Sequence, residues 1–123
     1  MYYYNMTNPF KDQEKFMLAC DQTVGEINSG QFILYKNLIK EEVKELDDAT
    51  CQEEQLDALT DILVVTIGAI HSMGANGEGA WNEVMRTNFA KIDNLTGKVR
   101  KREDGKVLKP DGWTPPNLVP FLK

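Results

Sequence analysis

The stretch LIKEEVKELDDATCQEEQLDALTD, residues 38–61, decides how this chain folds, because it holds two acidic segments around a short polar break at 49–51. Five of the acids around the break have a spacing that can bring them together: Glu41, Glu42, Glu45, Asp57 and Asp61. Glu45 and Asp57 lie six residues before and after Cys51. Glu41 and Asp61 lie ten residues before and after it. If both flanks are helices folded into a hairpin, equal rises of about 1.5 Å per residue place these acids at matching heights.

Such a cluster of carboxylates needs a positive partner. Spacings of three and four residues keep the acids on one face of each predicted helix. At an effective dielectric constant of about 20, two carboxylates about 4 Å apart repel each other by about 4 kcal/mol. No His or Cys stands at a suitable position, so the oxygen ligands predict a hard divalent cation, Mg²⁺ or Mn²⁺. A solvated helix face is the alternative interpretation, but Lys40 and Lys44 are too few to neutralise the acids.

Apolar residues at helical spacing predict four helices, at about 11–24, 32–49, 52–73 and 81–92. The third contains the β-branched run 62–70, for which a strand is the alternative, but its apolar register continues from the acidic part and favours a helix. A helix that is apolar on all sides must be covered on all sides, so we expect a second subunit to contribute. Side chains expected to face inward from the fourth helix include Trp81, Phe89 and Ile92. His71, near a predicted helix end, is expected to be a capping or surface residue.

The composition narrows the classes of protein. With 123 residues, 41% of them hydrophobic and 27% charged, the chain is expected to form one globular domain over residues 1–123. The net charge of -5 argues against a general nucleic-acid-binding protein. Cys20 and Cys51 follow no metal or redox spacing and are expected to be free thiols. Neither a membrane-spanning run nor a signal-like segment is found, so we expect a cytoplasmic protein.

After Asn94 the chain changes character, because its Gly and Pro residues exclude long helices. Lys and Arg outnumber the acids between 91 and 109. The segment 98–108, with a turn at 104–105, is expected to form a small hairpin or an ordered arm. A solvated basic arm is the simplest interpretation of this segment taken alone. Beside a carboxylate–metal site, however, Lys and Arg suit a polyphosphate, whose negative charge also ligates the metals.

Two blocks of sequence resemble a known superfamily. LIKEEVKEL at 38–46, followed by DALTD at 57–61, resembles the signature of the all-α NTP pyrophosphatases, which include MazG, the dimeric dUTPases and phosphoribosyl-ATP pyrophosphohydrolase. EVMRTNFAK at 83–91 and REDGKVLKP at 102–110 resemble the short MazG-like branch common in phages and bacteria, which includes MazZ-type enzymes. The resemblance covers about 38–116.

The resemblance implies an all-α bundle of four to five helices, with a helical core at about 11–92 and an irregular basic C-terminal arm at about 93–123. Oligomerisation to a homodimer or homotetramer is expected to complete it. The implied reaction cleaves a nucleoside triphosphate between the α and β phosphates, giving a monophosphate and pyrophosphate, with two or more Mg²⁺ or Mn²⁺ ions per site. Guanine nucleotides such as dGTP are the expected preference, in the host cytoplasm for a phage protein.

The resemblance also implies roles for single residues. The expected metal ligands are Glu42, Glu45, Asp57 and Asp61. Glu41 is the expected base that orients or deprotonates the attacking water. Phosphate contacts are expected from Asn88, Lys91, Lys98, Arg102, Lys106 and Lys109. The family pattern has an acid three residues before Asp61, where this chain has Ala58, so Asp57 is the expected substitute.

Two other functions stay open at this point. Phosphoribosyl-ATP is an alternative substrate within the same superfamily. A metal-stabilised helical interaction module without turnover is an alternative from another class of protein. No membrane contact and no stable nucleic-acid binding are expected for any of the three.

Overall fold

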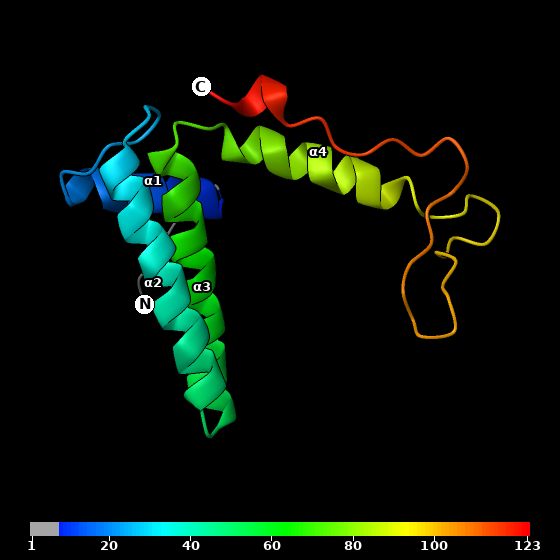
Figure 1. Cartoon of the computed structure of the whole chain (residues 1–123), viewed down its shortest axis with the longest axis horizontal. Coiled ribbons are helices and arrows are strands. Elements are labelled where there is room, and N and C mark those ends of the chain that lie inside the picture. Colours follow the sequence, from blue (N-terminus) through cyan, green and yellow to red (C-terminus); the bar gives the residue numbers. More distant parts are fainter. Residues whose placement is uncertain (1–7) are drawn as a thin grey trace, which may run out of the picture. The chain divides into compact units, whose positions relative to one another are not determined.

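The computed structural model describes residues 8–123, and the regular elements in this part of the chain are all helical (Figure 1). They are α1 Pro9–Ala19, α2 Ser29–Asp48, α3 Gln52–Ser72, α4 Gly77–Phe89 and the short 3-10 helix η1 Val119–Phe121. The chain divides into two units, one of residues up to Gly77 together with 122–123 and one of Glu78–Phe121. The prediction of an all-α fold with four main helices is confirmed. Within the described residues no helix is both long and apolar enough to cross a membrane.

The first unit is built on the hairpin of α2 and α3, which lie side by side in Figure 1. Asn28 begins α2, because its side-chain oxygen accepts a hydrogen bond from the backbone N–H of Gln31 at 3.1 Å. At the other end, Ala49 leaves the helical conformation with φ -65° and ψ 134°. Cys51 is then the extended N-cap residue of α3. The predicted break at 49–51 is therefore the loop that turns the chain back.

Two contacts fix the register between α2 and α3. The side chain of Gln31 donates a hydrogen bond to the hydroxyl of Ser72 at 2.8 Å. Four residues further along α2, the ring of Tyr35 packs against Gly68, four residues earlier in α3. A Cβ atom on Gly68 would lie closer than 3.0 Å to this ring, so only glycine allows the two helices to approach here. The two helices are thus antiparallel, and moving four residues forward in α2 corresponds to moving four residues back in α3.

The core of this unit lies near the open end of the hairpin, where α1 packs against α3. Met17 is completely buried, and it clusters with the buried Tyr35 and Ala69. His71 is buried too, and its Nε2 atom lies 2.8 Å from the carbonyl oxygen of Phe10, so it ties α3 to α1. The expectation of a capping or surface His71 was wrong, because a helix from another part of the chain covers it.

Helix ends differ from the sequence predictions where local backbone geometry decides them. α1 ends at Ala19 rather than near 24, because Asp21 takes a positive φ of 58° and leaves the helix. α2 starts at Ser29 rather than at 32, because the Asn28 cap supplies a start inside the predicted loop. α4 runs over Gly77–Phe89 instead of 81–92. Its first turn contains two glycines, which disfavour a helix, so the sequence pattern placed the start too late.

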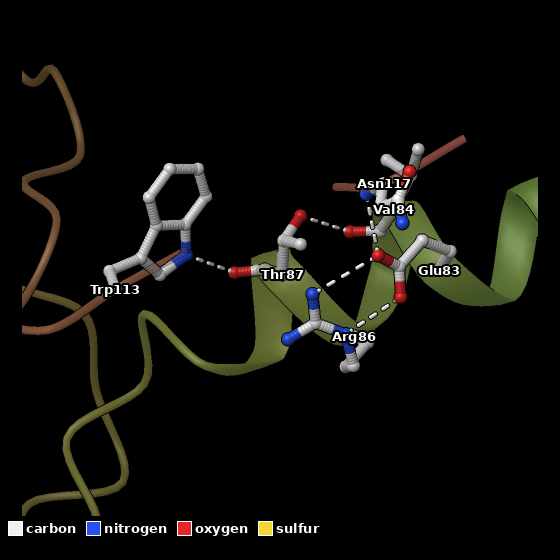
Figure 2. Close-up of polar contacts among 6 residues, drawn as sticks. All are labelled: Glu83, Val84, Arg86, Thr87, Trp113 and Asn117. Carbon is white, nitrogen blue, oxygen red and sulfur yellow. Dashed lines mark hydrogen bonds and ion pairs between the residues drawn. The ribbon is translucent and has the colours of Figure 1, made fainter. Parts of the chain in front are cut away.

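In the second unit, the segment after Pro110 runs back along α4. The backbone N–H of Asn117 donates to the Glu83 carboxylate at 2.7 Å, and the indole N–H of Trp113 donates to the carbonyl of Thr87 at 2.7 Å (Figure 2). We call residues 110–121 the strap. The expectation of inward side chains was wrong for three residues: Trp81 is 60% exposed, Phe89 61% and Ile92 40%, because the unit has too little chain to cover them. Val84 and Met85, also expected to face inward, are half-buried.

The segment between α4 and the strap pairs with itself. Isolated antiparallel bridges join Ile92 to Val99 and Lys101 to Val107. Between the second pair, Gly105 has a φ of 90°, and the N–H of Arg102 donates to the carbonyl of Lys106 at 2.8 Å. The predicted turn at 104–105 is therefore present, and of the two expected forms a small hairpin is observed.

The carboxylate of Glu83 anchors the strap and gives the second unit an acid-sensitive contact. Two hydrogen bonds lower the pKa of Glu83 from 4.5 to about 2: the larger effect comes from the Arg86 side chain and the smaller from the Asn117 N–H (Figure 2). Because the folded pKa is depressed, this stabilisation is fully present above 4.5 and is lost as the pH falls towards 2. We expect Glu83→Gln to weaken the second unit at neutral pH and to remove that part of its acid sensitivity. Tryptophan fluorescence during acid titration measures both effects.

The exposed Glu103 provides the control for this prediction, since it lies in the same unit and makes no contact with the strap. Glu103→Gln should leave the acid transition of the parent unchanged. Identical acid transitions for the parent and Glu83→Gln would show that the contact with Asn117 does not hold the strap.

Candidate active site

Glu42 is the centre of the predicted acid cluster. It is half-buried, and its Oε2 atom is shielded from solvent without a hydrogen-bond partner in the described chain. Its pKa is raised from the usual 4.5, first by desolvation and then by contact with the Glu45 carboxyl group. The negative charges of Glu45, Asp61 and Asp57 raise the pKa of Glu42 further. Acids from both arms of the hairpin therefore act on one carboxylate.

The register of the hairpin explains why these acids meet. Glu42 lies seven residues after Tyr35, and Asp61 lies seven residues before Gly68, which is the partner of Tyr35. Seven residues are about two helical turns, so both acids return to the face on which the ring and the glycine touch. The contact between Tyr35 and Gly68 thus sets the position of the acids two turns away.

Asp57 takes part in the cluster although it departs from the family pattern by one position. Ala58, at the position where the pattern has an acid, is only 2% exposed and lies on the packed side of α3. Asp57 is exposed, and its charge contributes to the raised pKa of Glu42. The carboxylate at position 57 therefore acts on Glu42, and its role as a metal ligand stays a prediction.

Glu41 is placed differently from the other four acids. It is exposed and is not among the charges that raise the pKa of its neighbour Glu42. The charges that act on Glu42 are thus those of Glu45, Asp57 and Asp61, and Glu41 is not one of them. Its role as a base stays a prediction.

The chemistry of the cluster fits a hard divalent cation. Its donors are carboxylate oxygens only, which suits Mg²⁺ or Mn²⁺. The unpartnered Glu42 Oε2 is an acceptor that a cation would satisfy. Within residues 8–123, no three His, Cys, Asp or Glu side chains already stand as a finished ligand set.

The predicted phosphate contacts lie in the second unit and fall into two groups. Lys91 donates to the Asn88 side chain at 3.0 Å, and both Lys91 and Lys109 lie against the ring of Trp113. Arg102, by contrast, is paired with Asp104 at 2.6 Å. The structure thus brings Asn88, Lys91 and Lys109 together, and it neutralises Arg102 locally.

Lys98 and Lys106 shape the loops through their backbones. The N–H of Lys106 donates to the Asp104 carboxylate at 3.1 Å, and the carbonyl of Lys98 accepts from the N–H of Asp93 at 2.8 Å. Their ammonium groups make no ion pair in the described part of the chain. Both lysines are exposed and stay predictions as phosphate contacts.

Sequence reasoning gave too little weight to Trp113 and left Arg100 out of the candidate site. Trp113 was given no role in the site by the sequence analysis, yet two candidate lysines lie on its ring. Arg100 lines a small pocket together with Lys91. The available signal was the sequence KPDGW at 109–113, in which a lysine and an aromatic residue flank a turn.

Comparison with known families decides the relationship. The family model described as phosphoribosyl-ATP pyrophosphohydrolase matches residues 22–88, more than half of the chain. This protein belongs to the phosphoribosyl-ATP pyrophosphohydrolase family. The match, together with the all-helical fold, confirms the expected relationship to the MazG-like all-α pyrophosphatases. No curated protein matches the chain.

Membership of the phosphoribosyl-ATP pyrophosphohydrolase family supports a nucleotide pyrophosphohydrolase activity in general. All five predicted acids lie inside the matched residues, and Asn88 is the last residue of the match. The other predicted phosphate contacts and Trp113 lie beyond it. The acid cluster thus lies inside the region that the family model matches, whereas most of the basic segment lies outside it and must be interpreted from its own contacts.

Proposed function

We propose that this protein is a divalent-metal-dependent pyrophosphohydrolase of nucleoside triphosphates. It cleaves the bond between the α and β phosphates and releases a nucleoside monophosphate and pyrophosphate. The observation that carries the proposal is the convergence of Glu42, Glu45, Asp57 and Asp61 from two helices, with one shielded Glu42 oxygen lacking a partner. Four neighbouring carboxylates destabilise a protein unless a cation neutralises them, so we propose that the cluster binds a divalent cation.

In this proposal the residues of the hairpin bind and orient. Glu42, Glu45 and Asp61 hold Mg²⁺ or Mn²⁺, two or more ions per site, and Asp57 replaces the acid that the family pattern has at position 58. When bound, such ions supply charge neutralisation for the phosphates and lower the pKa of a bound water. Glu41, exposed beside the cluster, is placed to accept the proton of the attacking water.

The reaction follows the usual course of phosphoryl chemistry. The water oxygen forms a bond to the α-phosphorus. In line with it, the bond between the α-phosphorus and the oxygen that bridges to the β phosphate breaks. The water proton goes to Glu41 and then to solvent, and the bridging oxygen leaves with the pyrophosphate. The negative charge of the phosphate chain is bound by the predicted phosphate contacts, which are Asn88, Lys91, Lys98, Arg102, Lys106 and Lys109.

Phosphoribosyl-ATP is the second candidate substrate, because the matching family is described by the enzyme that cleaves it. Both substrates offer the same anhydride between the α and β phosphates to the acid cluster. Among the triphosphates we propose guanine nucleotides, dGTP above all, on the resemblance of the blocks at 83–91 and 102–110 to the phage MazZ-type branch. The two candidate substrates share the triphosphate and differ in the base, which is guanine in dGTP and a substituted adenine in phosphoribosyl-ATP, so the base preference must be measured.

We also propose that a second copy of the chain covers the exposed side of α3. Leu56 and Leu63 are 67% and 65% exposed, and Leu59 lies between them on the same face. Burying apolar surface gives about 25 cal/mol per Å², so an uncovered leucine stripe favours association. A homodimer, or a tetramer of paired dimers, satisfies this requirement.

A panel of nucleotides tests the function directly. The purified protein is incubated with dGTP, the other seven common ribo- and deoxyribonucleoside triphosphates, and phosphoribosyl-ATP, with Mg²⁺, with Mn²⁺ or with EDTA. We expect pyrophosphate as the phosphorus product, turnover with either metal, and no turnover with EDTA. Orthophosphate as the first product would place the cleaved bond elsewhere. No turnover of any nucleotide would favour the interaction module.

A further inference from the structure

Two lysine ammonium groups lie against one aromatic ring in the second unit. The Nζ atoms of Lys91 and Lys109 are 5.3 Å and 4.7 Å from the centre of the Trp113 ring. Both distances are within the range of cation–π attraction, which is strongest for tryptophan. The lysines come from different elements, one just after α4 and one just before the strap, so Trp113 is what brings their charges together.

Trp113 is itself fixed to α4. Its indole N–H donates to the carbonyl of Thr87 at 2.7 Å, and Thr87 is only 2% exposed (Figure 2). The strap has a second anchor at Asn117, whose N–H donates to Glu83 at 2.7 Å. The pKa of Glu83, lowered to about 2, keeps this anchor charged at neutral pH. The ring therefore has a defined place on the helix.

The two ammonium groups have no negative partner. The ion pairs in residues 8–123 are made by other cations, and neither Lys91 nor Lys109 takes part in one. Their separation is at most the sum of the two ring distances, so they repel each other. An arrangement that gathers two unneutralised cations on a rigid ring is suited to an anion with more than one charge.

A small pocket adjoins Lys91. Its volume is about 140 Å³, and Arg100, Asp93 and Leu108 are among its lining residues. Sites for whole drug-sized ligands measure about 300–1,000 Å³, so this pocket suits a phosphate group rather than an entire nucleotide. The one acid in its lining, Asp93, already accepts a hydrogen bond from the N–H of Leu95 at 2.8 Å. The Asp93 carboxylate also accepts a hydrogen bond from the N–H of Thr96 at 3.3 Å.

We propose that Trp113 is a positioning residue that holds Lys91 and Lys109 as a clamp for the polyphosphate chain of the substrate. Lysine side chains are long and flexible, and ordering them on binding costs conformational entropy. The ring orders both ammonium groups before the substrate arrives, so this cost does not fall on binding. The inference rests on the proposed function, because it identifies the polyphosphate of that substrate as the anion.

Steady-state kinetics of two Trp113 variants test the clamp. For Trp113→Leu, which removes the ring, we expect KM to rise about tenfold with kcat changed by no more than about twofold. Trp113→Phe keeps a weaker ring and should recover part of the lost affinity. A KM equal to that of the parent in both variants would overturn the inference. Thermal unfolding of each variant is measured alongside, and Trp113→Phe decides the outcome if Trp113→Leu does not fold.

A combined variant separates positioning from simple structural support. In the background Lys91→Ala/Lys109→Ala, removing the ring should have no further effect on KM, because the cations that it positions are gone. An equally large effect in that background would overturn the inference. Lys101→Ala is the matched control, since it removes one positive charge from the same unit and Lys101 makes no contact with Trp113. It should leave KM unchanged.

Binding of inorganic tripolyphosphate, measured by calorimetry without metal, distinguishes failure of the clamp from failure of the proposed function. We expect the parent to bind tripolyphosphate about tenfold more tightly than Trp113→Leu does. If no nucleotide is hydrolysed but this difference is found, the enzyme proposal is wrong and the clamp stands. Equal affinities for tripolyphosphate would overturn the clamp, whatever the activity.

Discussion

Glu45→Gln and Asp61→Asn are each expected to lower kcat/KM at least about a hundredfold while the protein stays folded. Each change keeps the shape of the side chain but removes a charge that a cation needs. Both acids already act on Glu42, so either change reduces repulsion in the metal-free cluster. We therefore expect both variants to unfold at temperatures no lower than the parent does. Pyrophosphate release and thermal unfolding are the two measurements.

Asp47→Asn is the matched control for the acid variants. Asp47 is an exposed acid of α2 that belongs to the charges around Lys44 rather than to the cluster around Glu42. It should retain the activity of the parent. Light scattering should give all variants the same molar mass, which we expect to be a multiple of 14.0 kDa. Full activity of Glu45→Gln and Asp61→Asn would refute the metal site, and loss of assembly together with an inactive parent would favour the interaction module.

Gly68→Ala is expected to destabilise the protein by about 2–3 kcal/mol, because the added methyl group overlaps the ring of Tyr35. The ring is buried, at 5% exposure, and its hydroxyl donates to Gln22, so it has little room to move. Alanine favours a helix over glycine by about 1 kcal/mol, which offsets only part of this cost. Chemical denaturation followed by circular dichroism measures the change.

Gly30→Ala is the matched control for the packing prediction. Gly30 lies in the first turn of α2, where the nearest atom to an added Cβ is 3.9 Å away. This variant should be as stable as the parent or slightly more stable. In a Tyr35→Leu background, Gly68→Ala should cost clearly less, since the ring is gone. The same loss in both backgrounds would show that the ring does not set the distance between the helices.

Gly68→Ala also tests the link between packing and function. Tyr35 and Gly68 lie two turns from Glu42 and Asp61, and they set the height at which the two arms face each other. Any shift of one arm against the other therefore moves carboxylates that must share a cation. We expect the activity of the folded fraction of this variant to fall together with its stability.

The sequence determined the helical hairpin and the presence of acids on both of its arms. Apolar spacing identified α2 and α3, and the loop at 49–51 lies where the polar break predicted it. Equal spacing about Cys51 predicted Glu45 and Asp57 at matching heights, and the charges of both raise the pKa of Glu42. Both results follow from the fixed rise and period of a helix, which depend on nothing outside the segment.

Only the tertiary structure decided the other features. The end of α1 depends on a positive φ at Asp21, which leaves no periodic signal in the sequence. His71 is buried because α1 crosses it, and its partner Phe10 is distant in sequence. Trp113 likewise meets Lys91 only after the strap has turned back. Such contacts depend on which distant segments pack together, and a local pattern of residues does not encode that choice.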